Sequence, residues 1–125
     1  MKKIVSTKNA PAAIGPYSQA VEAGGLIFIS GQLPIDPATG TMAPAEIKAQ
    51  TEAVIKNLEA ILKAEGLALE NIVKTTVFMA DLGQFAQMNE TYGKFFIKDP
   101  PARATIEVKA LPKAALVEIE AIAAR

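Results

Sequence analysis

Residues 44–66, PAEIKAQTEAVIKNLEAILKAEG, decide the fold class of this chain. Core-type residues recur in it at steps of three and four, while lysines and glutamates occupy the opposite positions: Ile47, Thr51, Val54, Ile55, Leu58, Ile61 and Leu62. This spacing predicts an amphipathic helix that begins at Pro44 and runs to Gly66, since glycine suits the left-handed conformation that closes a helix. Because only one face of the helix is apolar, it must pack against another layer.

The chain before this helix has the pattern of a β-hairpin. Residues 9–16 contain two prolines and a glycine and are typical of a loop. Residues 17–21 alternate weakly, 23–25 are Ala-Gly-Gly, and 26–30 are strongly apolar, which predicts two strands joined by a tight turn. Residues 36–40, Asp-Pro-Ala-Thr-Gly, predict a type I turn with a left-handed glycine.

A strand and a second helix follow. Residues 71–80 are rich in β-branched side chains and predict a strand. Asp81 and Gln84 then form a capping pair, and a stripe of apolar residues at helical spacing runs on to Asp99-Pro100-Pro101, where the helix must end. The stripe is interpreted as core: Leu82, Phe85, Met88, Tyr92, Phe95 and Phe96.

Two further strands, 103–109 and 116–123, are separated by a short connection. If they pair as a hairpin, their polar faces coincide, because side chains alternate along a strand. One surface then carries Arg103, Thr105, Glu107, Glu118 and Glu120. The sequence does not fix the register, so the partner of each carboxylate stays open.

The element order ββ-α-β-α-ββ predicts an α+β fold, a mostly antiparallel sheet with two helices on one face. Residues 26–29 and 77–79 are nevertheless apolar on both faces of their strands. No part of the chain remains to cover the second face. We therefore expect a homo-oligomer that buries this face between its copies.

The composition limits the functional classes. A chain of 125 residues, half of them apolar, is expected to form one globular domain over residues 1–125. Its thirteen basic and thirteen acidic side chains cancel, so nucleic acid is a poor first choice of partner. The longest strictly hydrophobic run is residues 26–29, and no signal sequence is evident, so a cytoplasmic protein without a membrane span is expected.

The chain contains neither cysteine nor histidine. The usual general base, the commonest zinc ligands and any thiol nucleophile are therefore missing. Catalysis would have to use carboxylates, hydroxyls, lysines, arginine and backbone groups, and no metal or cofactor is expected.

Arg103 is the first candidate for a binding residue. Only Arg103 and the terminal Arg125 are arginines; all other basic residues are lysines. A guanidinium offers a planar set of donors that grips a carboxylate through two parallel hydrogen bonds. Two prolines shortly before it, at 100 and 101, place it at the start of a strand.

Six segments, in order along nearly the whole chain, resemble the Rid/YjgF family, and most closely its RidA subgroup of 2-iminobutanoate/2-iminopropanoate deaminases. They are Asn9–Tyr17, Ser30–Pro34, Ile72–Phe78, Asn89–Tyr92, Pro101–Arg103 and Val117–Ala121. The resemblance implies a chorismate-mutase-like fold, a homotrimer with a central barrel, and ligand sites between subunits, without a cofactor. It also implies hydrolysis of small 2-imino acids to 2-oxo acids and ammonia.

The same resemblance implies roles for single residues. Arg103 would bind the substrate carboxylate, and Glu118 would position or activate the attacking water. Tyr17, Ser30, Gly31, Asn89 and Thr105 would contact the substrate. Members of this subgroup usually carry a cysteine where this chain has Thr105, so a thiol-dependent role is not expected.

Two other functions remain open on the sequence. A non-catalytic trimer that binds 2-oxo acids and regulates a partner would need the same Arg103. A ribonuclease or translation inhibitor, as claimed for some relatives, fits poorly with zero net charge and no histidine.

Overall fold

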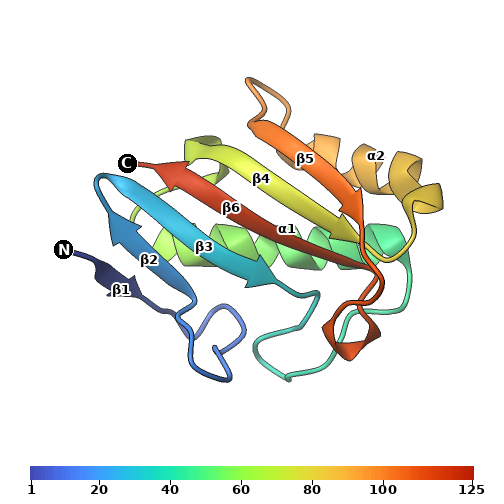
Figure 1. Cartoon of the computed structure of the whole chain (residues 1–125), viewed down its shortest axis with the longest axis horizontal. Helices are drawn as coiled ribbons and strands as arrows, with labels where there is room; N and C mark the ends of the chain where they lie inside the picture. The colour runs from blue at the N-terminus through green and yellow to red at the C-terminus, as the bar shows by residue number, and fades with distance from the viewer.

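The computed structural model describes all 125 residues and consists of one six-stranded sheet and two helices (Figure 1). The elements are β1 (Lys3–Val5), β2 (Ala20–Ala23), β3 (Leu26–Gln32), α1 (Ile47–Ala64), β4 (Ile72–Met79), α2 (Phe85–Phe95), β5 (Ala102–Glu107) and β6 (Val117–Ala124). Short 3-10 turns, η1 (Leu69–Asn71), η2 (Leu82–Gln84) and η3 (Pro112–Ala114), precede β4, α2 and β6.

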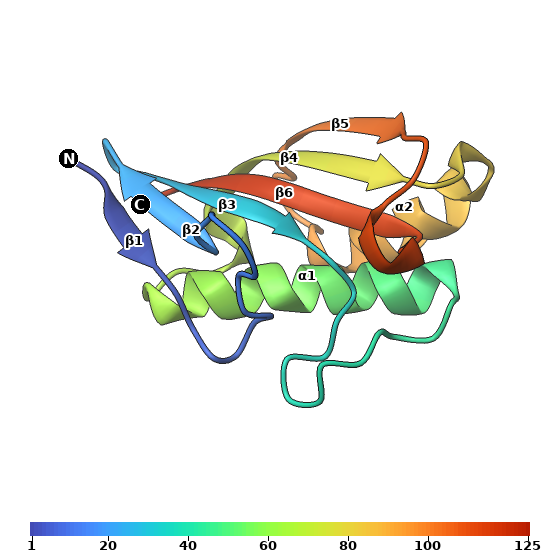
Figure 2. The ribbon, with the colours of Figure 1, turned by 60° about the horizontal axis from the view of Figure 1, so that its bottom comes forward.

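The strands lie in the order β1-β2-β3-β6-β4-β5. All neighbours are antiparallel except β4 and β5, which are parallel and are joined by α2. Both helices lie on the same side of the sheet, as Figure 2 shows. The predicted α+β class, with a mostly antiparallel sheet and helices on one face, is confirmed.

The core lies between α1 and the sheet. The apolar stripe of α1 is fully buried at Val54, Ile55, Leu58, Ile61 and Leu62. It packs with Val77 of β4 and with the inward-facing residues of β6 in one cluster of 22 buried residues. Full burial of such a side chain contributes roughly 1.5–3 kcal/mol, so this stripe is a main source of the fold's stability.

Helix α1 is shorter at its start than predicted. It begins at Ile47, because the side chain of Glu46 caps it by accepting bonds from the backbone N–H groups of Lys48 and Ala49 at 3.1 and 2.8 Å. Pro44 lies outside the helix. The predicted end is confirmed, since Gly66 follows the helix with φ +70°.

Strand β1 was not predicted from the sequence. It pairs antiparallel with β2 at the edge of the sheet. Nearby, Arg125 at the end of β6 forms a two-pronged bond to Glu22 of β2, with both N–O distances 3.0 Å, and also contacts Glu65 at 2.9 Å. These contacts tie the C-terminus to β2 and to the end of α1.

The last two strands do not pair with each other as a hairpin. β5 pairs with β4, in parallel, and β6 lies on the other side of β4. The reason is the crossover through α2, which returns the chain beside β4 in the same direction. β6 takes a central position, where Val117, Ile119 and Ala121 are buried as predicted.

The single polar surface that such a hairpin would have formed is absent for the same reason. Thr75 of β4 pairs with both Arg103 and Ala121, which places Arg103 on the helix-covered face. Phe78 pairs with both Ile106 and Glu118, which places Glu118 on the opposite face. Thr105 and Glu107 lie on the same face as Arg103, and Glu120 shares the face of Glu118.

This opposite face, here called the open face, is covered by no helix (Figure 2). Apolar side chains lie on it, among them Phe28 at 43% and Ile106 at 44% exposure. The expected uncovered apolar face is therefore present, while the oligomer that would bury it stays a prediction. No helix has the length and apolarity that a bilayer crossing requires.

Candidate functional site

Arg103 lies near the start of β5, in the gap between this edge strand and α2. Its Nη1 donates a 2.8 Å hydrogen bond to Oδ1 of Asn89. Its guanidinium lies over two rings of the same helix, 4.8 Å from the centroid of Tyr92 and 5.5 Å from that of Phe85. Such cation–π contacts hold the group flat against the rings. No carboxylate of the chain forms an ion pair with Arg103.

The ring beneath Arg103 is itself fixed. Tyr92 is 5% exposed, and its hydroxyl shares a 2.8 Å hydrogen bond with Thr75 of β4. Its ring also packs against Phe96 with centroids 4.5 Å apart. Burial raises the pKa of Tyr92, partly opposed by the bond to Thr75 and by the charge of Arg103, so the phenol stays neutral at physiological pH.

Thr105 follows Arg103 on the same face of β5. Its hydroxyl oxygen is buried and has no hydrogen-bond partner within the chain. A buried hydroxyl of this kind is uncommon, because it loses its bond to water without replacement. Further along β5, Glu107 accepts a 2.8 Å bond from the backbone of Leu82 and so positions the turn before α2.

Glu118 lies on the open face, against the backbone of Gly31 in β3. A Cβ atom at Gly31 would collide with the Glu118 carboxylate, so only glycine permits this approach. Burial raises the pKa of Glu118, and the neighbouring charge of Glu120 raises it further. A carboxylate with a raised pKa is a stronger base than a solvated one.

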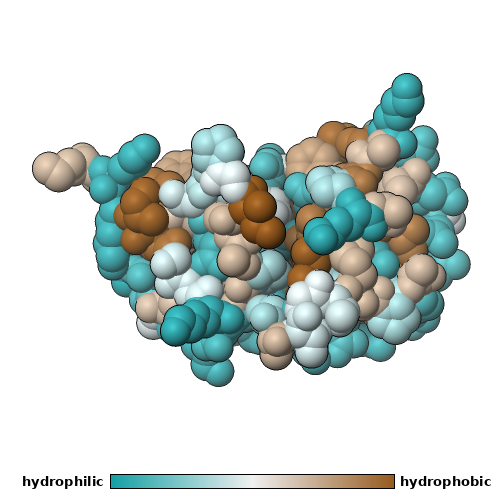
Figure 3. Space-filling model, turned by 90° about the horizontal axis from the view of Figure 1, so that it is seen from below, coloured by the Kyte–Doolittle hydropathy of each residue, from teal (hydrophilic) through white to brown (hydrophobic).

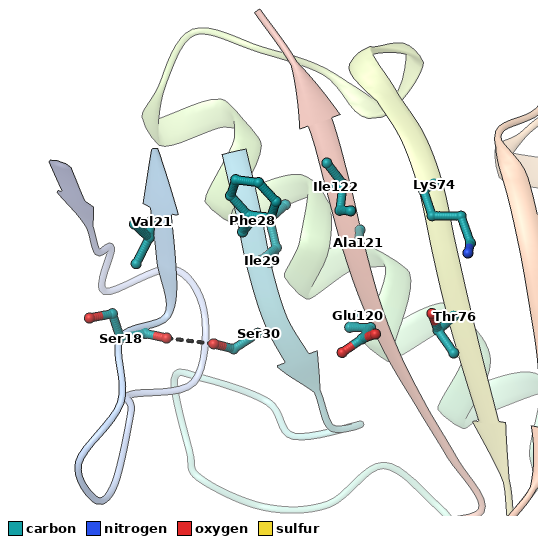
Figure 4. A pocket seen from close by; sticks show the side chains of 10 residues that line it. All are labelled: Ser18, Val21, Phe28, Ile29, Ser30, Lys74, Thr76, Glu120, Ala121 and Ile122. Atoms are coloured by element: carbon teal, nitrogen blue, oxygen red, sulfur yellow. Dashed lines mark hydrogen bonds between the residues drawn. The ribbon is translucent and has the colours of Figure 1, made fainter. Parts of the chain in front are cut away.

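Ser30 holds the segment that carries Tyr17. Its hydroxyl donates a 2.6 Å bond to the carbonyl of Ser18, drawn in Figure 4, and its backbone N–H donates to the carbonyl of Gln19 at 2.9 Å. Ser30 and Glu120 both line one open-face hollow of about 440 Å³. Figure 4 shows them on the adjacent strands β3 and β6. Tyr17 itself is 54% exposed.

The structure thus brings the predicted residues together in two groups. The arginine half-site consists of Asn89, Arg103 and Thr105 on the helix-covered face. The glutamate half-site consists of Tyr17, Ser30, Gly31 and Glu118 at the open face and its adjoining loop. Within one chain the two groups are separated by the sheet, so they do not form one site.

Phe85 and Tyr92 lie against the guanidinium of the arginine half-site but were interpreted only as core from the sequence. A signal was present in their spacing. Phe85, Asn89 and Tyr92 are spaced four and three positions apart, so all three lie on one face of the helix. Asn89 on this face bonds Arg103. The strand pairing that puts Arg103 opposite this face was not readable from the sequence.

The residues of neither half-site form a metal centre. No group of three or more histidine, cysteine, aspartate or glutamate residues lies close enough to hold a metal ion. What the two groups offer is an anion-binding guanidinium and a carboxylate of raised basicity.

Comparison with known proteins gives consistent matches. The sequence profile of the family described as Endoribonuclease L-PSP matches residues 7–125. The chain is 50% identical to the 2-iminobutanoate/2-iminopropanoate deaminase of Escherichia coli, over all of this chain and 99% of that protein. It is 51% identical to a RutC family protein of Pyrococcus horikoshii, over 98% of each chain. The crystal structure of Escherichia coli TdcF with bound serine superimposes with a TM-score of 0.94, at 45% identity over 98% of each chain.

Proposed function

The chain belongs to the Endoribonuclease L-PSP family, the Rid/YjgF family that its sequence motifs resemble, and on that premise we propose that it hydrolyses reactive 2-imino acids to 2-oxo acids and ammonia. The substrates would be small, such as 2-iminobutanoate and 2-iminopropanoate. The working unit would be a homotrimer of single domains, each spanning residues 1–125. This reaction would serve amino-acid metabolism in the cytoplasm.

One observation carries the proposal. Arg103 is held in place by Asn89 and two aromatic rings, yet no carboxylate of the chain pairs with it. A fixed guanidinium with free donors is suited to a carboxylate supplied by a ligand. The 1-carboxylate of a 2-imino acid lies directly beside its electrophilic carbon, so binding there orients the reacting C=N bond.

The base would come from a second copy of the chain. Since Glu118 and Arg103 lie on opposite faces of the sheet, one chain cannot apply both to one small molecule. A neighbour packed against the open face would complete the site and would also cover Phe28 and Ile106. We therefore place Arg103, Asn89 and Thr105 of one copy opposite Tyr17, Ser30, Gly31 and Glu118 of the next.

The reaction needs only these groups. Glu118 accepts a proton from water as the water oxygen attacks the imine carbon, and the nitrogen takes up a proton from bulk solvent to form a carbinolamine. The protonated Glu118 then donates its proton to the nitrogen as the carbon–nitrogen bond breaks. Ammonia leaves, the hydroxyl releases its proton to solvent as it becomes the 2-oxo group, and the carboxylate returns to its starting form. The raised pKa of Glu118 suits both halves of this exchange.

A coupled assay tests the proposal. A threonine dehydratase generates 2-iminobutanoate, and the release of 2-oxobutanoate is followed with and without this protein. We expect faster release with the wild-type chain. No acceleration, together with tight binding of 2-oxobutanoate, would instead indicate the second candidate, a regulatory protein that binds 2-oxo acids through the same Arg103.

The family description also names an endoribonuclease. The chain has zero net charge and no histidine, so it has neither an excess of positive charge to attract RNA nor the usual base for RNA cleavage. We therefore do not propose cleavage of RNA. Ribonuclease activity that remains constant per mole through successive purification steps would contradict this choice.

A further inference from the structure

Three segments enclose a hollow of about 520 Å³ at one end of the sheet. The segments are the loop before β2, the end of β3 with the chain after it, and the turn before β6. We call this cavity the Tyr17 hollow; the residues that matter here are Ile14, Tyr17, Gly31, Leu33, Ile35 and Lys113. Figure 3 views the molecule from this end, where apolar residues reach the surface in patches among polar ones.

The walls of the Tyr17 hollow are mainly aliphatic, prolyl and aromatic. Lys113 is the single charged residue that lines it. The open-face hollow differs, since both Lys74 and Glu120 line it. Ile14 is 83% exposed at the rim, so an apolar group that entered would remove much of its surface from water.

Buried amide side chains fix the segments around this hollow. Gln19 is 4% exposed; its Oε1 accepts from the Thr7 N–H at 2.7 Å, and its Nε2 donates to the carbonyls of Thr7, Ala10 and Pro11 at 3.1, 3.2 and 2.7 Å. Asn57 of α1 donates to the carbonyls of Leu33 and Ile35 at 3.0 and 2.9 Å.

The turn before β6 is held in the same way, because Oε1 of Gln50 accepts from the Leu116 N–H at 2.8 Å. The shape of the hollow is therefore set before any ligand arrives. A preformed cavity binds more tightly than one whose walls must first be ordered.

Gly31 joins the Tyr17 hollow to Glu118. It lines the hollow, and its backbone lies directly against the Glu118 carboxylate. A small molecule whose reacting carbon faces Glu118 can therefore place its side chain beside Gly31. Glu118 itself does not line the hollow, so Gly31 links the two, and beyond Gly31 the hollow is lined by Tyr17 and by the two aliphatic residues that follow β3.

We infer that the Tyr17 hollow is the side-chain subsite and that it favours 2-imino and 2-oxo acids whose aliphatic side chain is longer than ethyl. This inference rests on the proposed function for the position of the reacting carbon. An isobutyl group, as in the 2-oxo acid that corresponds to leucine, is small compared with the hollow. Each additional methylene that becomes buried there is expected to tighten binding by about fourfold.

Titration calorimetry with 2-oxo acids tests the inference without requiring turnover. The three probes are 2-oxobutanoate, 4-methyl-2-oxopentanoate and 2-oxoglutarate, each added to the wild-type protein at pH 7. We expect 4-methyl-2-oxopentanoate to bind about tenfold more tightly than 2-oxobutanoate, since it adds two carbons that are partly covered. Equal or weaker binding overturns the inference. Tightest binding of 2-oxoglutarate also overturns it, because Lys113 would then define an acidic subsite. Binding of none of the three overturns it together with the proposed function.

Ile14→Ala and Ile97→Ala form a matched pair for this test. Both isoleucines are 83% exposed, so neither substitution threatens the fold, but Ile97 lies outside the Tyr17 hollow. We expect Ile14→Ala to weaken 4-methyl-2-oxopentanoate several-fold while 2-oxobutanoate changes little, and Ile97→Ala to change neither. Equal loss for both ligands, or a lower assembly mass of Ile14→Ala by sedimentation, shows that Ile14 does not act through a side-chain subsite.

The same measurements separate the two proposals. If the preference for the longer chain holds but no 2-imino acid is hydrolysed faster, the subsite stands and catalysis fails. If imine hydrolysis is accelerated with no dependence on side-chain length in binding, catalysis stands and the subsite fails.

Discussion

The two faces of the sheet carry the two half-sites, and the charged side chains on them, Arg103 and Glu118, have different surroundings. On the helix-covered face, Arg103 is fixed by Asn89, Phe85 and Tyr92, and Tyr92 is fixed in turn by Thr75. On the open face, Glu118 makes no ion pair, and burial together with the nearby charge of Glu120 raises its pKa.

Under the proposed function, this difference divides the work between the two faces. The covered face would hold the substrate anion in one orientation, while the open face would supply a carboxylate whose raised pKa costs stability. Neither face would then be sufficient alone, and a second copy would attach at the uncovered apolar side chains around Glu118.

The largest expected effect comes from a substitution on the open face. Glu118→Gln removes the proposed base, and we expect kcat for 2-iminobutanoate hydrolysis to fall by about 10²- to 10⁴-fold, while 2-oxobutanoate still binds. The coupled dehydratase assay and calorimetry measure the two quantities. Unchanged kcat would mean that Glu118 is not the base.

Thermal unfolding serves as the control for Glu118→Gln. Since burial disfavours the charged form, the raised pKa of Glu118 costs stability as the pH rises from its unfolded pKa of about 4.5 to its folded value and beyond. The neutral glutamine removes this cost. The variant should therefore have a Tm at pH 7 equal to or above that of the wild type.

Arg103→Lys tests the arginine half-site on the helix-covered face. Lysine keeps the charge but loses the planar donors and their stacking on Tyr92 and Phe85. We expect kcat/KM to fall by about 100-fold, a loss within the roughly 2–5 kcal/mol range for a broken buried charge pair. Most of the change should be in KM and in 2-oxobutanoate affinity. A variant with wild-type affinity would remove Arg103 from the site.

A smaller effect concerns the pH dependence of kcat/KM, which Glu118 on the open face is expected to control. Glu118 must be deprotonated to act, so kcat/KM should rise with pH through its raised pKa. Glu120→Gln removes the neighbouring negative charge, and the acidic limb of the profile should move to lower pH. A Glu120→Gln profile that coincides with that of the wild type would show that Glu120 does not tune Glu118.

The smallest effect lies away from both half-sites. Arg125→Ala removes exposed contacts to Glu22 and Glu65, and we expect Tm at pH 7 to fall by on the order of 2 °C with unchanged kcat. Arg125 lowers the pKa of Glu22, so its contribution exists above the ordinary value of 4.5 and is lost as the pH falls through the folded value. The difference in Tm should vanish in strong acid and shrink in high salt. A loss of activity would instead place Arg125 in the site.

Several features of the fold can be predicted from the sequence because they depend on local residue patterns. The period of α1, the left-handed Gly66 and the turn that Gly40 closes with φ +76° each depend on a few neighbouring residues. The apolar pattern of residues 26–29 also predicts the uncovered face that Phe28 occupies.

The remainder depends on pairing between distant segments. Whether Arg103 and Glu118 share a face is decided by β4, which accepts β5 on one side and β6 on the other. A short connection between two strands favours a hairpin, and nothing within residues 103–123 indicates that β4 intervenes. For the same reason, Phe85 and Tyr92 could be interpreted as core although they lie against Arg103.

The central claim is that one site needs Arg103 of one copy and Glu118 of another. Two inactive variants, Arg103→Ala and Glu118→Gln, are unfolded together in equal amounts, refolded and assayed. In randomly mixed trimers about one quarter of the sites receive both intact residues, so we expect about a quarter of the wild-type activity to return. Activity no higher than that of either variant refolded alone, with mixed trimers present, would contradict the claim.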